Sequence, residues 1–127
     1  MPKEIARIYE IGLVTEVKGD ISTIEIHPEY SEALLRIETK EYLDVLFWIP
    51  LSRDILQVHP RGDRSVPVRG VFSTRSPARP NNIGVTKVRL IERNGNIIKV
   101  KGLDAYKGTS VIDIKSGRGA SNGNGHH

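Results

Sequence analysis

The sequence predicts an all-β fold: a small single-sheet β-barrel of antiparallel strands with one short helix. Three observations support this prediction. Apolar residues recur at every second position in several short segments, turn residues separate those segments, and no long amphipathic segments are present to serve as the helical crossovers of a parallel sheet. Several short strands at this spacing are typical of a closed barrel or a sandwich.

The first two strands form the start of the predicted sheet. Residues 11–17 alternate with a period near two, which places Ile11 and Leu13 on one face. Residues 19–20, Gly-Asp, indicate a turn, and a second strand then runs through residues 24–26. We expect these two strands to be neighbours in the sheet.

The only helix that we predict lies between this pair of strands and the most apolar segment of the chain. Ser31 can cap a short helix that runs through Glu38. Residues 42–49, YLDVLFWI, are rich in aromatic and β-branched types, which predicts a buried central strand. Pro50 ends that strand, because proline has no N–H to donate to a sheet.

The second half of the chain continues with short strands. We expect strands over residues 54–58 and 68–72, with a polar loop and an irregular segment after them. Residues 83–91 predict a longer strand whose Val88 face is apolar and whose Lys87 face is polar.

The last strands are separated by two turns. Asn94-Gly95 is the strongest turn signal in the chain, because both residues tolerate the positive φ of a two-residue hairpin. Residues 98–100 then run back antiparallel, Lys107-Gly108 makes another turn, and residues 112–114 form the last strand.

Length and composition indicate a single folded domain. The chain has 127 residues, enough for one core, and we expect a domain over residues 1–115 and a disordered tail over residues 116–127. The absence of cysteine excludes disulfides and thiolate zinc sites and fits a reducing compartment. No apolar run reaches the roughly 20 residues of a membrane-spanning helix. We therefore expect a cytoplasmic protein with no membrane partner.

Charge is divided unevenly along the chain. Residues 1–50 carry five Lys and Arg against ten Asp and Glu, whereas residues 51–127 carry fourteen against five. This asymmetry suggests a polyanionic partner for the second half. The alternative is that these charges are simply solvated.

The basic segment from Arg61 to Pro80 is the strongest functional signal from the residues themselves. It contains five arginines, no lysine, a single acid and three prolines. Arginine binds carboxylate or phosphate through two parallel hydrogen bonds, and proline holds a loop in shape, so the segment is suited to bind an anion. The alternative is a structural loop whose arginines pair with the acids of residues 1–50.

Two motifs resemble those of a known family. Residues 69–84, RGVFSTRSPARPNNIG, closely resemble the first motif of the TsaA/YaeB/TrmO-like family, and residues 102–115, GLDAYKGTSVIDIK, resemble its second motif. Weaker similarity extends the resemblance over residues 5–115. The resemblance implies a small β-barrel that binds S-adenosylmethionine and methylates N6 of threonylcarbamoyl-adenosine at position 37 of tRNA. It also implies a homodimer with the cofactor near the subunit interface.

The resemblance also implies which residues form the site. The residues expected to contact the cofactor are Tyr42, Leu43, Arg75, Arg79, Asn81, Ile83, Gly84, Val85, Asp104, Tyr106, Gly108 and Thr109. Asp104 and Asn81 are the candidate catalytic acceptors for protons of the adenosine amine. Tyr42 or Tyr106 is a candidate to stack on an unpaired base.

The remaining basic residues are assigned to RNA. The candidates for contact with tRNA phosphates are Arg61, Arg64, Arg69, Lys87 and Arg89. His27 and His59 are expected to be structural or solvated, and no metal site is predicted.

The chain departs from the family pattern at several positions. Tyr42 stands where the family usually has a histidine, and Asn82 stands where it usually has a proline. A non-catalytic protein that binds S-adenosylmethionine therefore remains an alternative to the methyltransferase, as does an RNA-binding barrel without a cofactor.

Overall fold

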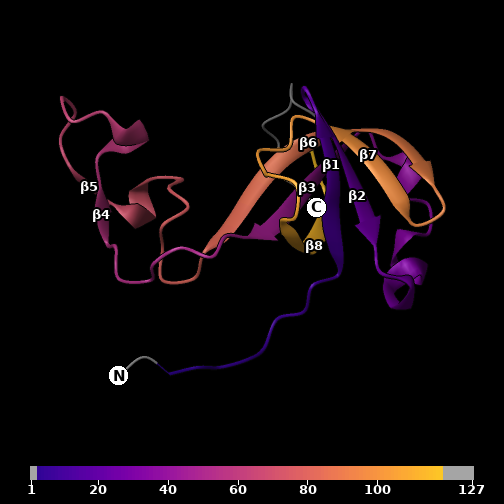
Figure 1. The fold of residues 1–127 in the computed structure, drawn as a ribbon, viewed down its shortest axis with the longest axis horizontal. Helices are drawn as coiled ribbons and strands as arrows, with labels where there is room; N and C mark the ends of the chain where they lie inside the picture. The colour runs from indigo at the N-terminus through magenta and orange to yellow at the C-terminus, as the bar shows by residue number, and fades with distance from the viewer. Residues whose placement is uncertain (1–2, 119–127) are drawn as a thin grey trace.

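The computed structural model describes residues 3–118 and shows a closed antiparallel barrel with a long excursion on one side (Figure 1). The barrel strands follow the order β1 (Gly12–Lys18), β2 (Ile21–Ile26), β7 (Ile97–Lys101), β6 (Ile83–Asn94), β3 (Tyr42–Trp48) and β8 (Ser110–Ser116). Pairing of β8 with β1 through Gly12↔Val111 and Leu13↔Ser110 closes the ring. The predicted single-sheet barrel is confirmed.

The barrel interior holds the core. Strand β3 alternates strictly, with Leu43, Val45 and Phe47 buried, and it pairs with both β6 and β8, which confirms its predicted central position. The buried core cluster consists of Val14, Ile24, Ile26, Leu34, Leu43, Val45, Phe47, Val88, Ile98, Val100 and Val111. The apolar Val88 face that was predicted for β6 is therefore the inward one.

Strand β1 turns the Gly12 and Val14 face toward the core, a choice that the alternation alone did not decide. Gly12 and Val14 are buried, whereas Leu13 is half-buried. A Cβ at Gly12 would lie 2.7 Å from the Glu25 carbonyl oxygen, so only glycine fits this inward position. A bulge between Val14 and Glu16 then shifts the register of the strand. Such bulges add twist and help a sheet to curve into a barrel.

The hairpin between β6 and β7 lies one residue later than predicted. Asn94 still pairs with Ile97, so the two-residue loop is Gly95-Asn96. Gly95 has φ of +61°, and a type II′ hairpin turn has glycine at this first position. The Asn96 side chain is used elsewhere, because its Nδ2 atom donates to the Ile26 carbonyl oxygen at 2.5 Å.

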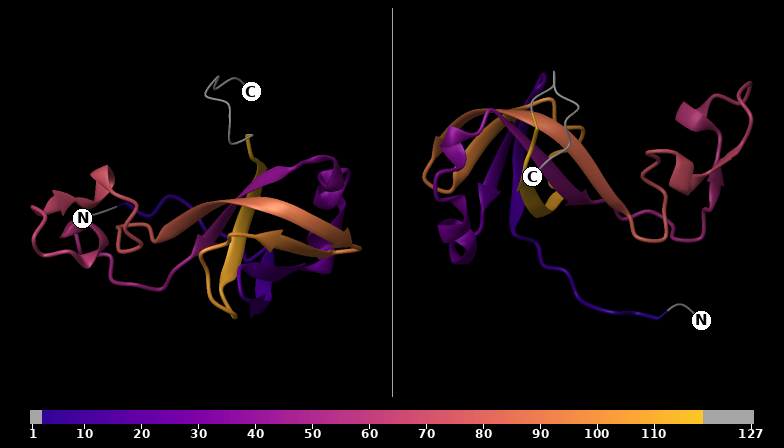
Figure 2. Two further views of the ribbon diagram at one scale, coloured as in Figure 1. Left: turned by 90° about the horizontal axis from the view of Figure 1, so that it is seen from above. Right: turned by 180° about the vertical axis from the view of Figure 1, so that it is seen from behind.

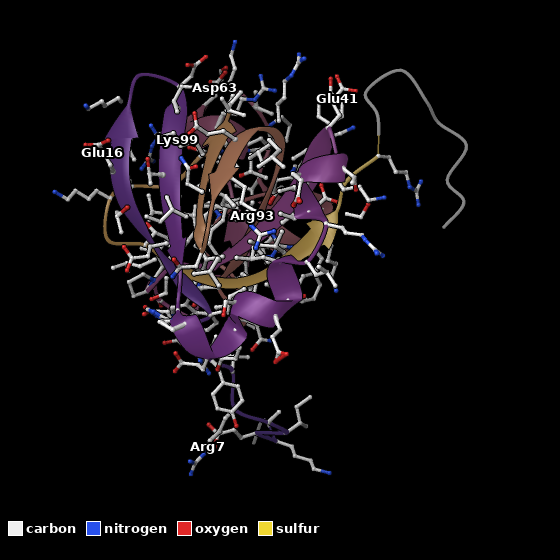
Figure 3. All side chains as sticks on the ribbon, turned by 90° about the vertical axis from the view of Figure 1, so that its right-hand side faces the viewer. Arg7, Glu16, Glu41, Asp63, Arg93 and Lys99 are labelled. Atoms are coloured by element: carbon white, nitrogen blue, oxygen red, sulfur yellow. The ribbon has the colours of Figure 1, made fainter. Side chains whose placement is uncertain are left out.

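The predicted helix is present as two short 3₁₀ segments, η1 (Pro28–Leu34) and η2 (Ile37–Thr39). Arg36, with φ of +64°, separates them, and Ser31 donates to the Pro28 carbonyl oxygen instead of capping a helix. Arg93 of β6 holds this region against the barrel (Figure 3), since it donates to the Leu34 carbonyl oxygen and to Glu38, both at 3.0 Å.

Residues 50–82 leave the barrel after β3 and return at β6, and we call them the excursion. They extend to one side of the barrel in every view (Figures 1 and 2). The excursion contains a two-stranded sheet of β4 (Gln57–Val58) and β5 (Arg69–Gly70) and the 3₁₀ turns η3 (Pro60–Gly62) and η4 (Val71–Ser73). Its strands are shorter than the two that the sequence suggested.

The ends of the described chain differ from each other. The N-terminal segment before β1 runs out from the barrel on the same side as the excursion (Figure 2). At the other end, β8 includes Ser116, and the Gly117 N–H donates to the Tyr42 carbonyl oxygen at 3.0 Å. The rest of the expected tail, from residue 119, lies outside the described residues. Within residues 3–118, no helix has the length and apolar character needed to cross a lipid bilayer.

Candidate functional site

A cleft of about 810 Å³ lies where the excursion leaves and rejoins the barrel. Four stretches of chain contribute its walls: the end of β3, residues 74–79 of the excursion, the start of β6 and the loop before β8. The lining residues are Phe47, Trp48, Ile49, Pro50, Leu51, Thr74, Arg75, Ser76, Pro77, Arg79, Ile83, Gly84, Val85, Thr86, Asp104, Ala105, Tyr106 and Thr109. Both motifs that the sequence singled out therefore meet at one cleft.

Two arginines of the first motif shape their own loop. Arg79 donates through Nη1 to the carbonyl oxygens of Thr74 and Ser76, both at 3.0 Å. Arg75 donates through Nη2 to the Val85 carbonyl oxygen at 3.2 Å. Each guanidinium group has five N–H donors, so both keep donors for a ligand.

The excursion arginines do not pair with the acids of residues 1–50. Among residues 3–118, no ion pair joins any of Arg61, Arg64, Arg69, Arg75 and Arg79 to a carboxylate. The alternative of a loop neutralised by those acids is therefore not what the structure shows.

Asn82 fixes the base of the excursion from inside. It is 1% exposed, and its Nδ2 atom donates to the Pro77 carbonyl oxygen at 2.9 Å. Its backbone carbonyl accepts from the Ile49 N–H at 2.9 Å, which joins the two ends of the excursion. Asn82 thus supports two walls of the cleft, one at Pro77 and one at Ile49. The family pattern that this sequence resembles has a proline at the position of Asn82.

The loop of the second motif is anchored at its end. Gly108, with φ of +92°, donates to the Val14 carbonyl oxygen at 2.7 Å, and the Val14 N–H donates to the Thr109 carbonyl oxygen at 3.0 Å. These bonds hold the loop against β1. Tyr106 is 88% exposed at the cleft, and the Asp104 carboxylate, also exposed, makes no hydrogen bond or ion pair with another described residue.

Gly84 is required by its neighbour in the barrel rather than by a ligand. A Cβ at this position would lie 2.6 Å from the Cε2 and Cζ atoms of Phe47. The ring of Phe47 packs against the glycine and forms part of the cleft wall. Gly84, which was expected to contact the cofactor, lines the cleft and has the Phe47 ring as its close neighbour.

Several predicted cofactor residues lie away from the cleft. Leu43 is 1% exposed inside the barrel, and Tyr42 lies at the opposite end of β3 from Trp48, with Lys87 5.1 Å from its ring centroid. Asn81 is exposed, and its carbonyl accepts from the Ile83 N–H at 2.7 Å, but it does not line the cleft. Gly108 acts through the anchor to Val14.

Trp48 belongs to the site although the sequence indicated only a core role. It is half-buried, lines the cleft and lies under Arg53, whose Cζ atom is 5.6 Å from the ring centroid. The alternation along β3 contains this signal, because Leu43, Val45 and Phe47 point inward and Trp48 must then point out. Thr74 and Ser76 line the cleft as well, and nothing in their sequence context distinguishes them from loop-forming residues.

His27 and His59 have structural partners. His27 Nε2 lies 2.7 Å from Glu10 Oε1, and Ser110 donates to the other oxygen of the same carboxylate. These hydrogen bonds lower the pKa of Glu10, the bond from Ser110 most strongly. His59 Nδ1 lies 2.9 Å from the Val66 carbonyl oxygen. His27 therefore ties the N-terminal segment to the start of η1, and His59 closes the loop that ends at Val66.

Comparison with known proteins adds independent information. Residues 12–117 match the family described as the tRNA-methyltransferase O N-terminal domain. A protein of Archaeoglobus fulgidus, named as a probable S-adenosyl-L-methionine-binding protein, is 53% identical over 93 residues, which is 72% of this chain and 25% of that protein. A protein of Methanothermobacter thermautotrophicus with the same name is 50% identical over 95 residues, covering 74% of this chain and 67% of its own length.

A solved structure shares the fold. The crystal structure of TrmO aligns with a TM-score of 0.73 at 25% identity and covers 98% of this chain but 64% of that chain. The present chain thus spans about two thirds of that structure and a quarter of the first relative.

Proposed function

This chain belongs to the family of the tRNA-methyltransferase O N-terminal domain, and we propose that it transfers a methyl group from S-adenosylmethionine to an adenosine amine of tRNA. The finer proposal, which follows from the resemblance, is N6 of threonylcarbamoyl-adenosine at position 37. The observation that carries the proposal is the convergence of both family motifs on one cleft. The names of the archaeal relatives support the choice of cofactor.

The cleft fits S-adenosylmethionine in size and in chemistry. Its volume of about 810 Å³ lies within the roughly 300–1,000 Å³ typical of small-molecule sites. Apolar side chains of Trp48 and Ile83 suit an adenine ring, and the free donors of Arg75 suit a carboxylate. Hydroxyl groups of Thr74, Ser76 and Thr109 add further polar contacts to the wall.

Methyl transfer to an amine depends mainly on the alignment of the reacting groups. S-adenosylmethionine, when bound, supplies an electrophilic methyl group on a positively charged sulfur, which becomes neutral as the methyl group leaves. The cleft walls hold the reacting groups in line, and such proximity is worth several kcal/mol, up to about 7–11 kcal/mol in the best-oriented cases. Asp104 accepts the proton that the amine loses as its nitrogen gains the methyl group. Of the two predicted acceptors, Asp104 is favoured because it lines the cleft and Asn81 does not.

Labelled methyl transfer to unfractionated tRNA, followed by nucleoside analysis, tests this proposal. We expect N6-methylated product with the wild-type protein and a loss of about 100-fold or more with Asp104→Asn, while the affinity for S-adenosylmethionine measured by calorimetry changes little. Asp113→Asn is the matched control, because Asp113 lies on β8 beside Lys115 and outside the cleft. Equal rates for the two variants would remove Asp104 from the mechanism.

A non-catalytic S-adenosylmethionine-binding protein is the second candidate. It is favoured by the relatives' names, which mention binding only, and by Tyr42 at the position of the family's usual histidine. Tight cofactor binding in the calorimeter together with no transfer to any tRNA would select it.

We also infer a homodimer, in line with the family resemblance. The excursion, the rim of the cleft and the N-terminal segment expose many large apolar side chains, and extended apolar surfaces of this kind mark interfaces. The side chains concerned are Ile5, Ile8, Tyr9, Leu51, Ile55, Leu56, Val66, Val68, Phe72, Ile83, Val85 and Tyr106. A second copy seated on this side would cover them and would lie next to the cleft.

A further inference from the structure

The excursion carries the whole net charge of the protein. Its 33 residues contain six arginines, two aspartates, no lysine and no glutamate, which gives +4. The full chain also has a formal charge of +4, so the remaining residues are balanced between acids and bases. A positive potential is therefore concentrated on the segment that projects beside the barrel (Figure 1).

The six arginines fall into two groups according to their contacts. Arg75 and Arg79 bond the backbone at the cleft, and Arg53 lies over Trp48. The other three are Arg61, Arg64 and Arg69, which we call the outer arginines. All three are exposed, and within the described part of the chain none of their guanidinium groups makes a hydrogen bond, ion pair or ring contact.

The loop that carries two of the outer arginines is ordered by its own hydrogen bonds. His59 closes it onto Val66, and the Gly62 and Asp63 N–H groups donate to the carbonyl oxygens of His59 and Pro60 at 2.9 and 3.0 Å. Arg61 is held at φ of +56°, a conformation that costs a non-glycine residue about 1–2 kcal/mol. A loop formed in advance loses little entropy when its side chains bind a partner.

The acid of this loop does not neutralise the arginines. The Oδ1 atom of Asp63 accepts from the backbone N–H of Ser65 at 2.9 Å and from its hydroxyl at 2.6 Å. Its carboxylate is thereby held to the loop backbone, and the guanidinium groups of Arg61 and Arg64 remain without an anionic partner.

The two other basic residues that the sequence assigned to RNA are in a different situation. Lys87 lies over the Tyr42 ring at 5.1 Å, and its register partner on β3 is Asp44. Arg89 forms an ion pair with Glu41 at 3.6 Å. Both lie on the wall of the barrel, where Arg89 has an acidic partner and Lys87 has an aromatic one.

We propose that the outer arginines form the surface that binds the phosphate backbone of the RNA, and that Lys87 and Arg89 take no part in it. The choice of tRNA as the RNA rests on the proposed function. The planar fork of donors on arginine matches phosphate oxygens, and three such side chains along a projecting segment can follow a nucleic-acid strand whose reactive base lies in the cleft. Contacts of this kind position the substrate without reading its sequence.

The salt dependence of tRNA binding tests the proposal. Anisotropy with labelled unfractionated tRNA over a series of salt concentrations compares three proteins. They are the wild type, a triple variant with Arg61→Gln, Arg64→Gln and Arg69→Gln, and a control with Lys87→Gln and Arg89→Gln. Each phosphate contact contributes about 0.7–0.9 to the slope of log K against log salt concentration, so the triple variant should lose about two units of slope. We expect it to bind at least about tenfold more weakly at moderate salt, and the control to bind like the wild type.

Two further measurements separate the possible outcomes. Affinity for S-adenosylmethionine, measured by calorimetry, should stay within about twofold in both variants, because neither changes the cleft. An unchanged slope in the triple variant, or an equal loss in the control, would overturn the assignment. An unchanged slope with an altered sedimentation coefficient would assign the outer arginines to a second copy of the chain instead. If the wild-type protein binds tRNA but transfers no methyl group to it, the assignment of the outer arginines holds and only the proposed reaction is ruled out.

Discussion

At Gly84, a single hydrogen in place of a side chain lets the barrel and the cleft share one wall. The Phe47 ring occupies the space that a Cβ would need, at 2.6 Å from two ring carbons. Phe47 is 4% exposed, so its ring has little room to move without disturbing the core. The absence of a side chain at residue 84 therefore supports both the packing of the barrel and the shape of the site.

We predict that Gly84→Ala destabilises the protein by about 1–3 kcal/mol, the usual cost of overpacking. Urea unfolding followed by fluorescence measures the change. Gly70→Ala is the matched control, because the nearest atom to its Cβ would be the Leu56 carbonyl oxygen at 4.0 Å. Combining Gly84→Ala with Phe47→Leu should recover part of the loss, whereas purely additive losses would show that the ring is not the obstacle.

Asn82 is the second residue on which the cleft depends, and it stands outside the lining. Its side-chain donor serves the Pro77 carbonyl, while the Oδ1 atom is buried without a protein partner. We predict that Asn82→Ala costs about 1–3 kcal/mol of stability and also weakens S-adenosylmethionine binding, because the wall at Pro77 loses its tie.

Asn96→Ala provides the comparison for this prediction. Its Nδ2 atom makes a similar bond to the Ile26 carbonyl oxygen, far from the cleft on the hairpin of β6 and β7. Unfolding and calorimetry should show a loss of stability in both variants and a loss of affinity in Asn82→Ala alone. Equal affinities would mean that Asn82 stabilises the fold without shaping the site.

The sequence predicted only part of the candidate site. Most of the residues that were predicted to contact the cofactor line the cleft. Among them are Arg75, Arg79, Ile83, Val85, Asp104, Tyr106 and Thr109. Tyr42 and Leu43 were placed there by alignment with the family alone, and the direction of β3 carries them to the far end of the barrel. Trp48 was missed because an aromatic residue in an apolar strand usually belongs to the core. Only the alternation of its neighbours along β3 indicates that it points outward.

At the scale of elements, the errors have a common physical origin. The sequence pattern did not decide which face of β1 is buried, and it placed the hairpin of β6 and β7 one residue early. In each case the apolar pattern predicted the correct strand, but register depends on long-range partners: Ile26 lies opposite Gly12, and the Ile26 carbonyl accepts from Asn96. Likewise, contacts of Arg93 with Leu34 and Glu38 hold a 3₁₀ segment where local propensity suggested a regular helix.

The junction of the N-terminal segment with β8 and η1 gives a pH-dependent prediction. The pKa of Glu10 lies below its ordinary value of 4.5, first because Ser110 donates to the carboxylate and second because His27 does. A carboxylate with a lowered pKa in the folded state adds stability above its ordinary pKa, and that stability disappears as the pH falls through the lower, folded value.

We therefore predict that Glu10→Gln lowers the free energy of unfolding at pH 7 by less than about 1 kcal/mol, because the pair is largely exposed. The difference from the wild type should shrink as the pH falls below 4.5. Urea titrations at neutral and acid pH measure both values. Ser110→Ala, which removes the larger cause, should behave like Glu10→Gln, and a difference that stays constant with pH would contradict the linkage.

For the whole molecule, the chain outside the excursion carries no net charge and its barrel encloses the core, whereas the excursion carries a net positive charge and exposes large apolar side chains. Strand pairing and the alternating core were predictable, because they depend on local periodicity. The projection of residues 50–82 away from the barrel was not, since apolar residues such as Leu56 and Phe72 normally indicate burial in the same chain. Their exposure has a physical explanation if another molecule covers them.

A second copy of this chain is the partner that we infer, and Phe72 tests it. The side chain is 81% exposed on η4, which directly precedes residues 74–79 of the cleft wall. Burying an aromatic ring at an interface is commonly worth about 2 kcal/mol or more, so Phe72→Asp should weaken the dimer by at least about 30-fold. Leu35→Asp is the control, because Leu35 is 74% exposed between η1 and η2, away from the excursion. Sedimentation equilibrium should show wild type and Leu35→Asp as dimers and Phe72→Asp shifted toward monomer. A monomeric wild type, or two variants that associate equally, would assign the apolar surface to a different partner.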